Sequence, residues 1–137
     1  MPIDMTMTTT TTTKKSAAMK AALLDYVAAF NAADAERVVA LFADDATVED
    51  PVGSPVIAGR ESILAFYRHA TSLGAHLEVV AAPRGSHGNA AALCFTVYAQ
   101  LQGRSVRIDV TDVMTFGADG RITGMRAFWG PDDVQPQ

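Results

Sequence analysis

The spacing of the apolar residues changes at Gly74, and this change constrains the fold more than any other feature of the chain. Before Gly74, apolar residues recur every three or four positions, which is typical of amphipathic helices. After it they recur at every second position, which is typical of strands that bury one face. This order predicts an α+β fold in which three helices pack on one face of a curved, mostly antiparallel sheet.

The three helices are expected in the first half of the chain. The first starts near Ser16, a plausible N-cap. The second is capped by Asp34 and ends at Asp44-Asp45, and the third follows Gly59-Arg60. Their apolar positions are Met19, Ala22, Leu23, Tyr26, Val27, Phe30, Val38, Leu41, Phe42, Ile63, Phe66, Tyr67 and Ala70.

Strands are expected at residues 46–50, 77–82, 91–101, 105–116 and 121–129. Residues 51–55 hold two prolines, so they form a loop or a sheet edge. Gln102-Gly103 and residues 117–120 are turn-forming sequences between strands, and they predict hairpins.

Composition limits the class of protein. The chain has 137 residues, 49% hydrophobic and 19% charged, which is enough apolar material for one packed domain. Its net charge of -4 argues against nucleic-acid binding. No run approaches the ~20 apolar residues of a membrane span, which argues against a membrane protein. The single cysteine, Cys94, cannot form an intrachain disulfide, which fits a reducing, cytoplasmic location.

The first fifteen residues differ from the rest. They contain a threonine run at 8–13 and no buried-face pattern, so they cannot offset the entropy lost on ordering. Their two lysines follow a polar run rather than precede an apolar one, which argues against a secretory signal. We therefore expect a disordered Thr-rich tail at residues 1–15 and a single domain at residues 16–137.

One acidic residue interrupts the apolar side of a predicted strand. In the strand ending at Phe116, alternate residues face opposite sides, and Asp112 falls on the apolar side. Burial disfavours the charged carboxylate, so the pKa of Asp112 is expected to be raised. A neutral carboxylic acid donates a hydrogen bond. Pairing of Asp112 with a cation from another strand is the alternative.

Two further polar groups lie on apolar faces. Asp50 shares its strand face with Ala46 and Val48, and Tyr26 sits on the buried stripe of the first helix. Core packing would explain Tyr26, and a loop cap or salt bridge would explain Asp50. If these residues and Asp112 meet in one pocket, a carboxylate could take a proton from carbon while two donors stabilise the enolate oxygen. That chemistry needs neither metal nor cofactor.

The chain resembles a known family over residues 16–129, the bacterial steroid delta-isomerases or ketosteroid isomerases of the nuclear-transport-factor-2-like, SnoaL-like superfamily. The resemblance rests on FADDATVEDPVG at 42–53 with IAGRE at 57–61, and on IDVTDVM at 108–114 with DGRI at 119–122 and AFW at 127–129. It implies a conical fold with a deep apolar pocket, a homodimer and a small-molecule steroid substrate.

The resemblance also implies roles for individual residues. Asp50 matches the general base, Tyr26 an oxyanion donor and Asp112 a neutral oxyanion donor, the last being a documented feature of ketosteroid isomerases. Tyr67 matches a tyrosine that hydrogen-bonds the oxyanion tyrosine in some members. The positions expected to bind substrate are Trp129, Phe66, Tyr67, Leu93, Val97 and Phe42.

The reaction implied is the isomerisation of a 3-oxo-delta-5-steroid to the conjugated 3-oxo-delta-4-steroid. A proton would move from carbon 4 to carbon 6 through a dienolate, with no cofactor. Two alternatives stay open, because a fold does not determine a function. One is a non-catalytic module for apolar-ligand binding or dimerisation. The other is a polyketide-cyclase-like enzyme.

Overall fold

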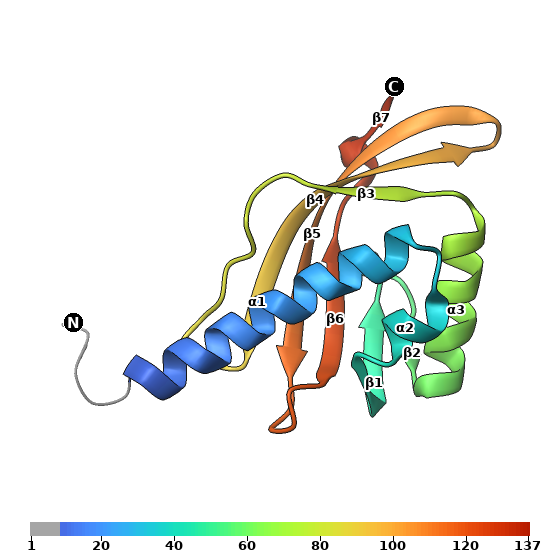
Figure 1. The fold of residues 1–137 in the computed structure, drawn as a ribbon. Coiled ribbons are helices and arrows are strands. Elements are labelled where there is room, and N and C mark those ends of the chain that lie inside the picture. Colours follow the sequence, from blue (N-terminus) through green and yellow to red (C-terminus); the bar gives the residue numbers. More distant parts are fainter. Residues whose placement is uncertain (1–8) are drawn as a thin grey trace.

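The computed structural model describes residues 9–137, which form three α-helices, one short 3₁₀ helix and seven β-strands (Figure 1). The helices are α1 (Thr9–Asn31), α2 (Ala35–Val39), α3 (Arg60–Ser72) and the 3₁₀ helix η1 (Pro131–Asp133). The strands are β1 (Phe42–Glu49), β2 (Ile57–Ala58), β3 (His76–Val79), β4 (Ala90–Leu101), β5 (Arg104–Phe116), β6 (Ile122–Phe128) and β7 (Val134–Pro136).

The strands form one sheet in the order β2-β1-β6-β5-β4-β3, and β7 pairs with the start of β5. All neighbours are antiparallel except β1 and β6, which run parallel. In Figure 1 the sheet is curved and open, α1 crosses one of its faces, and α3 stands beside β1. The predicted α+β architecture, three helices on a curved and mostly antiparallel sheet, is confirmed.

The first helix begins earlier than expected. Residues 9–15, assigned to the tail from sequence, are helical, and α1 is continuous from Thr9. Once a helix has formed, each further turn costs little, and threonine is only a few tenths of a kcal/mol poorer than good helix formers. The helical start near Ser16 is therefore wrong. Residues 1–8 of the predicted tail lie outside the described residues.

The second helix is shorter than expected. It ends at Val39, and Phe42 already belongs to β1, whereas the sequence placed Phe42 in the helix and began the strand at residue 46. The cause is long-range pairing, because Phe42 lies opposite Ile122 of β6 and the Ile122 N–H donates to the carbonyl of Leu41. Helical spacing over so few residues could not reveal that contact.

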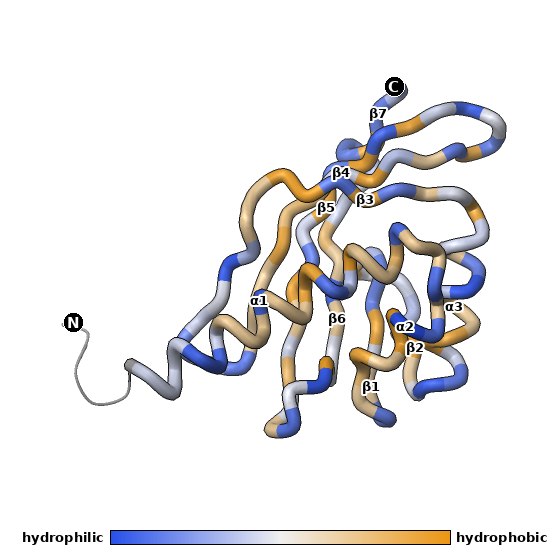
Figure 2. The backbone as a smooth tube through the Cα atoms, viewed as in Figure 1, coloured by the Kyte–Doolittle hydropathy of each residue, from blue (hydrophilic) through white to orange (hydrophobic). Residues whose placement is uncertain are grey.

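The inner face of the sheet is apolar and follows the expected alternation. Figure 2 shows hydrophobic residues recurring along its strands. On β5 the residues Ile108, Val110, Asp112, Met114 and Phe116 are all buried, while their neighbours in the strand are partly or fully exposed. The hairpin from β4 to β5 turns at Gln102-Gly103, whose φ angles are 52° and 78°. Both are positive, as a two-residue hairpin turn requires.

None of the helices in residues 9–137 is both long and apolar enough to span a membrane.

Candidate active site

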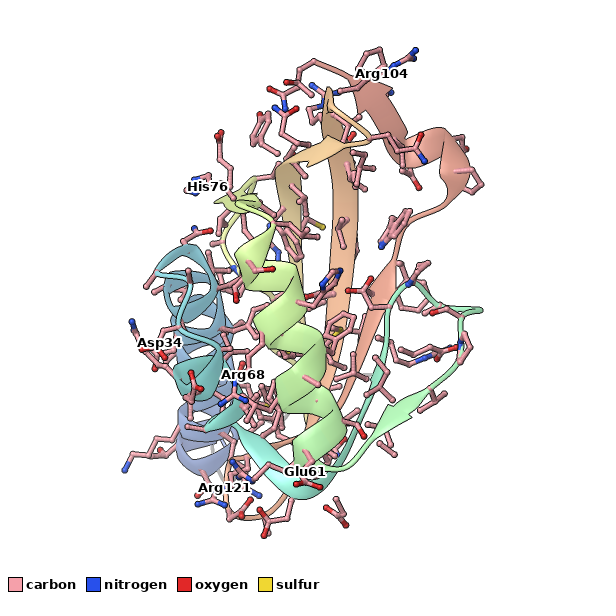
Figure 3. All side chains as sticks on the ribbon, turned by 90° about the vertical axis from the view of Figure 1, so that its right-hand side faces the viewer. Asp34, Glu61, Arg68, His76, Arg104 and Arg121 are labelled. Carbon is pink, nitrogen blue, oxygen red and sulfur yellow. The ribbon has the colours of Figure 1, made fainter. Side chains whose placement is uncertain are left out.

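An apolar cavity of about 230 Å³ lies between the helices and the inner face of the sheet. Five of its lining residues carry polar groups: Tyr26, Asp50, Tyr67, Asp112 and Trp129. The others are apolar, namely Phe30, Ala70, Leu73, Ala75, Leu77, Phe95, Val97, Ala99, Ile108 and Val110. The six polar residues that are labelled in Figure 3 all lie on the outside of the molecule, away from this cavity.

A larger hollow of about 490 Å³ lies elsewhere, beside the first half of α1. Its walls include Thr12, Lys15, His87 and Phe116, and it contains none of the candidate catalytic residues. Volume alone does not define a site. We place the candidate site in the smaller cavity, because buried titratable groups converge there.

Asp112 lies at the floor of this cavity, in the middle of β5. It pairs with Leu93 of β4 on one side and Ala127 of β6 on the other, and it is 1% exposed. Neither carboxyl oxygen has a hydrogen-bond partner in the described part of the chain. Burial, and then the nearby charge of Asp50, raises the pKa of Asp112 well above its ordinary value. Burial therefore favours the protonated form of the Asp112 carboxyl, which can donate a hydrogen bond.

Two tyrosines from different helices meet at the cavity wall. The hydroxyl of Tyr26 on α1 lies 2.8 Å from that of Tyr67 on α3, and the rings pack edge to face with centroids 5.7 Å apart. Burial, followed by the neighbouring Tyr67 and Asp112, raises the pKa of Tyr26 well above its ordinary value. Both phenols therefore stay protonated, and the pair has one hydroxyl proton left to donate into the cavity.

Asp50 follows directly after β1, and Trp129 follows directly after β6. Since β1 and β6 run parallel, their ends lie together, and Nε1 of Trp129 donates to Oδ1 of Asp50 over 2.9 Å. Burial raises the pKa of Asp50, whereas the bond from Trp129 opposes that rise. Asp50 is also less buried than Asp112, so burial disfavours its carboxylate form less.

The backbone after Asp50 is anchored from both sides. The carboxylate of Glu49 accepts hydrogen bonds from the Gly53 N–H and from Nε of Arg126. The Val52 N–H donates to the carbonyl of Ala127 on β6. These bonds fix the backbone on both sides of Asp50, and so hold its carboxyl at the cavity.

The structure brings together six of the residues that the sequence nominated: Tyr26, Asp50, Tyr67, Val97, Asp112 and Trp129. The other three do not line the cavity. Phe42 and Phe66 pack against the ring of Tyr67, at centroid distances of 5.8 and 5.0 Å. Leu93 is 1% exposed within the core. These three support the site from behind.

Sequence reasoning missed most of the apolar lining. Ile108 and Val110 share the strand face of Asp112, and Phe30 shares the helix stripe of Tyr26, so a signal for these three existed. For Leu73 and Ala75 the sequence contains no such signal, because they lie between the end of α3 and the start of β3 and belong to no periodic pattern.

The geometry decides between the alternatives left open for the two acids. In residues 9–137 no arginine or lysine lies within ion-pair distance of Asp112 or Asp50. Asp50 instead accepts a bond from an uncharged indole N–H. The cavity therefore holds the Asp50 carboxyl together with a phenol and a second, more deeply buried carboxyl that can donate hydrogen bonds.

The chain is similar to several known proteins. A model of the SnoaL-like domain matches residues 23–125. The steroid Delta-isomerase of Nocardioides simplex is 40% identical over 119 residues, which are 87% of this chain and 95% of that protein. The epoxide hydrolase LasB of Streptomyces lasalocidi is 37% identical over 120 residues, which are 83% of this chain and 42% of that protein.

Among solved structures, one of SalBIII is similar, with a TM-score of 0.82 and 25% identity over 87% of this chain and 95% of that one. SalBIII is described as an epoxide hydrolase/cyclase-like enzyme with a role in pyran ring formation in the polyether salinomycin. The fold and these similarities are thus those of a family that contains enzymes. The chain belongs to the SnoaL-like family, with the nuclear-transport-factor-2-like fold, and is an enzyme of that family.

Proposed function

We propose that this protein is a steroid delta-isomerase, which converts a 3-oxo-delta-5-steroid to its conjugated delta-4 isomer. The observation that carries the proposal is the buried Asp112 carboxyl. Its oxygens are without a partner in the described residues, and it shares an apolar cavity with Asp50 and Tyr26. The 40% identity to a steroid Delta-isomerase supports the same reaction.

Asp50 is the general base in this proposal. Its ionised carboxylate removes a proton from carbon 4 of the steroid, and the protonated acid then delivers that proton to carbon 6. One carboxyl serves both carbons because they lie along one edge of the steroid. The Trp129 bond leaves one of the two carboxyl oxygens, Oδ2, free to carry the proton.

Tyr26 and Asp112 stabilise the dienolate oxygen that forms at carbon 3. In this mechanism Tyr67 is the donor in the 2.8 Å bond between the two hydroxyls, so that Tyr26 can donate its own proton to the substrate. The neutral Asp112 supplies the second donor. Donors that are fixed in a dry cavity need no reorganisation as charge develops, and each is typically worth ~10²–10³-fold in rate. No cofactor takes part.

The test is ultraviolet absorbance with 5-androstene-3,17-dione, since conjugation of the product creates a new band. We expect turnover by the wild type, and a fall of roughly 10²–10⁴-fold for Asp50→Asn, which cannot accept the proton. Asp45→Asn is the matched control, because Asp45 is an exposed aspartate of β1, the strand that Asp50 directly follows. Absent turnover, or equal turnover in the two variants, would refute the proposal.

Epoxide opening is the second candidate, and the relation to LasB favours it. Neutral Asp112 would protonate the epoxide oxygen as the carbon–oxygen bond breaks. Asp50 would take the proton from the attacking water or hydroxyl. A delta-4-3-ketone can form only by isomerisation, whereas a mass gain of one water from an apolar epoxide reports hydrolysis. Both substrates belong in the same experiment.

A homodimer is part of the proposal. The side of β6 that faces away from the helices carries Phe128, which is 42% exposed and has Arg126 stacked over its ring at 5.3 Å. An aromatic side chain of this kind suits the centre of a protein interface. Sedimentation equilibrium of the wild type and of Phe128→Ser tests it, with a dimer expected for the first and weakened association for the second.

A further inference from the structure

The cavity has a direction, which follows from the strand register. Its floor follows inward-facing positions of β4 and β5, from the level of Leu93 and Asp112 to the level of Ala99. That is six residue steps on β4, or roughly 20 Å at ~3.3 Å per residue. The donors Tyr26 and Asp112 belong to one end of this path, and Ala99 to the other.

The end at Ala99 is apolar and reaches the surface. The register of β3 and β4 brings Ala75 level with Ala99, and Leu73, two residues before Ala75, lines the cavity and is 49% exposed. Among the described lining residues, polar side chains other than the five named above are absent. A ligand whose oxygen meets Tyr26 and Asp112 therefore turns a hydrocarbon end, rather than a polar one, toward this opening.

The apolar surface continues past the opening onto the β4–β5 hairpin. Alternation along β4 puts Leu101 on the same face as Ala99, and Leu101 is 41% exposed. The hairpin projects beyond the end of α3 in both ribbon views (Figures 1 and 3). Arg104, at the tip of the hairpin, pairs with Leu101, and the apolar surface ends there. Exposed leucines that continue a ligand cavity differ from leucines scattered singly on a surface.

We propose that Leu73 and Leu101 form a subsite for the hydrocarbon side chain of the substrate, and that this enzyme prefers 3-oxo-delta-5-steroids that keep a long alkyl chain at carbon 17. The inference rests on the proposed function, since the isomerase orientation sets carbon 3 at Asp112. With carbon 3 there, carbon 17 is the far end of the ring system and points along β4 toward Ala99. The alkyl chain at carbon 17 would then lie on Leu73 and Leu101.

The experiment compares ligands that share the ring system and differ in the side chain. Cholest-5-en-3-one and 5-androstene-3,17-dione serve as substrates, and their conjugated products serve as binding ligands, all in the same cyclodextrin. Binding is followed by quenching of Trp129, the single tryptophan of the chain, which lines the cavity. Each carbon buried contributes roughly 0.8 kcal/mol, so two buried carbons already give about tenfold tighter binding.

The variant is Leu73→Ser/Leu101→Ser. The matched control is Leu24→Ser, because Leu24 is a leucine of similar exposure, 46%, that does not line the cavity. For the double variant we expect kcat/KM and affinity to fall about tenfold or more for the alkyl-bearing compounds and less than threefold for the others. The control should change neither. Equal losses for both ligands, or equal wild-type affinities, would overturn the subsite.

Two further results separate the possibilities. If the wild type turns over neither substrate but still discriminates by binding, the proposed reaction fails and the subsite stands. If light scattering shows that the double variant loses a dimer present in the wild type, and ligand discrimination is unchanged, the leucines form an interface between copies and the subsite is wrong.

Discussion

Nε1 of Trp129 donates a hydrogen bond to Oδ1 of Asp50 across 2.9 Å, although the two residues are 79 positions apart in the chain. The bond stabilises the carboxylate form and so opposes the rise in the pKa of Asp50 that burial causes. In the proposed mechanism Asp50 is the general base and must be deprotonated before it can act, so this bond would extend the active pH range to lower pH.

Trp129→Phe should therefore shift the acidic limb of the kcat/KM profile to higher pH. Phenylalanine keeps an aromatic wall but donates nothing, so burial acts on Asp50 unopposed and its pKa rises further. The measurement is kcat/KM for the steroid from pH 4 to 8. A limb that stays in place while the plateau falls would mean that Trp129 only packs against substrate.

Tyr67→Phe should lower turnover less than Tyr26→Phe. Tyr26 contacts the developing oxyanion in the proposed mechanism, and loss of one such donor typically costs ~10²–10³-fold. Tyr67 acts only through its 2.8 Å bond to Tyr26, and loss of a bond of that kind is worth roughly 0.5–1.5 kcal/mol, or about 2- to 12-fold. Steady-state kinetics of both variants check the order. A larger loss for Tyr67→Phe would make Tyr67 the direct donor.

Asp112→Asn should retain more activity than Asp112→Leu. The amide of asparagine is still a hydrogen-bond donor of similar size, whereas leucine removes the donor. Turnover of the two variants at one pH, beside their melting temperatures, is the comparison. If both lose equal activity, the neutral-donor role of Asp112 is wrong.

Asp112 should also make stability depend on pH. Its folded-state pKa is raised well above the ordinary 3.8, mainly by burial, so between 3.8 and the raised value the folded state holds a proton that the unfolded state has released. Stability must then fall as pH rises through this window. Asp112→Asn lacks this titration. Its free energy of unfolding, relative to that of the wild type, should therefore increase as the pH rises from 4.5 to 8.

Denaturant unfolding of the wild type and Asp112→Asn at several pH values provides that comparison. Asp109→Asn is the control, since Asp109 is an exposed aspartate of the same strand. A constant difference between the wild type and Asp112→Asn over the whole range would contradict the raised pKa.

The sequence by itself predicted the features that depend on local repeats. The stripe through Tyr26 is helical and buried, and Asp112 faces inward, because helix and strand periodicity fix the direction of each side chain within its own element. The hairpin at Gln102-Gly103 was predictable for the same reason, since few residues adopt positive φ in a turn. The family motif added the nomination of Asp50.

The tertiary structure decided which elements meet. The sequence could not show that Phe42 joins a strand, because its partner Ile122 lies 80 positions away and local spacing carries no record of such pairing. Nor could it separate Val97, which lines the cavity, from Leu93, which is buried in the core on the same strand face. Hydrophobicity drives both inward alike. Whether a buried side chain meets another side chain or an open cavity depends on where the helices rest on the curved sheet.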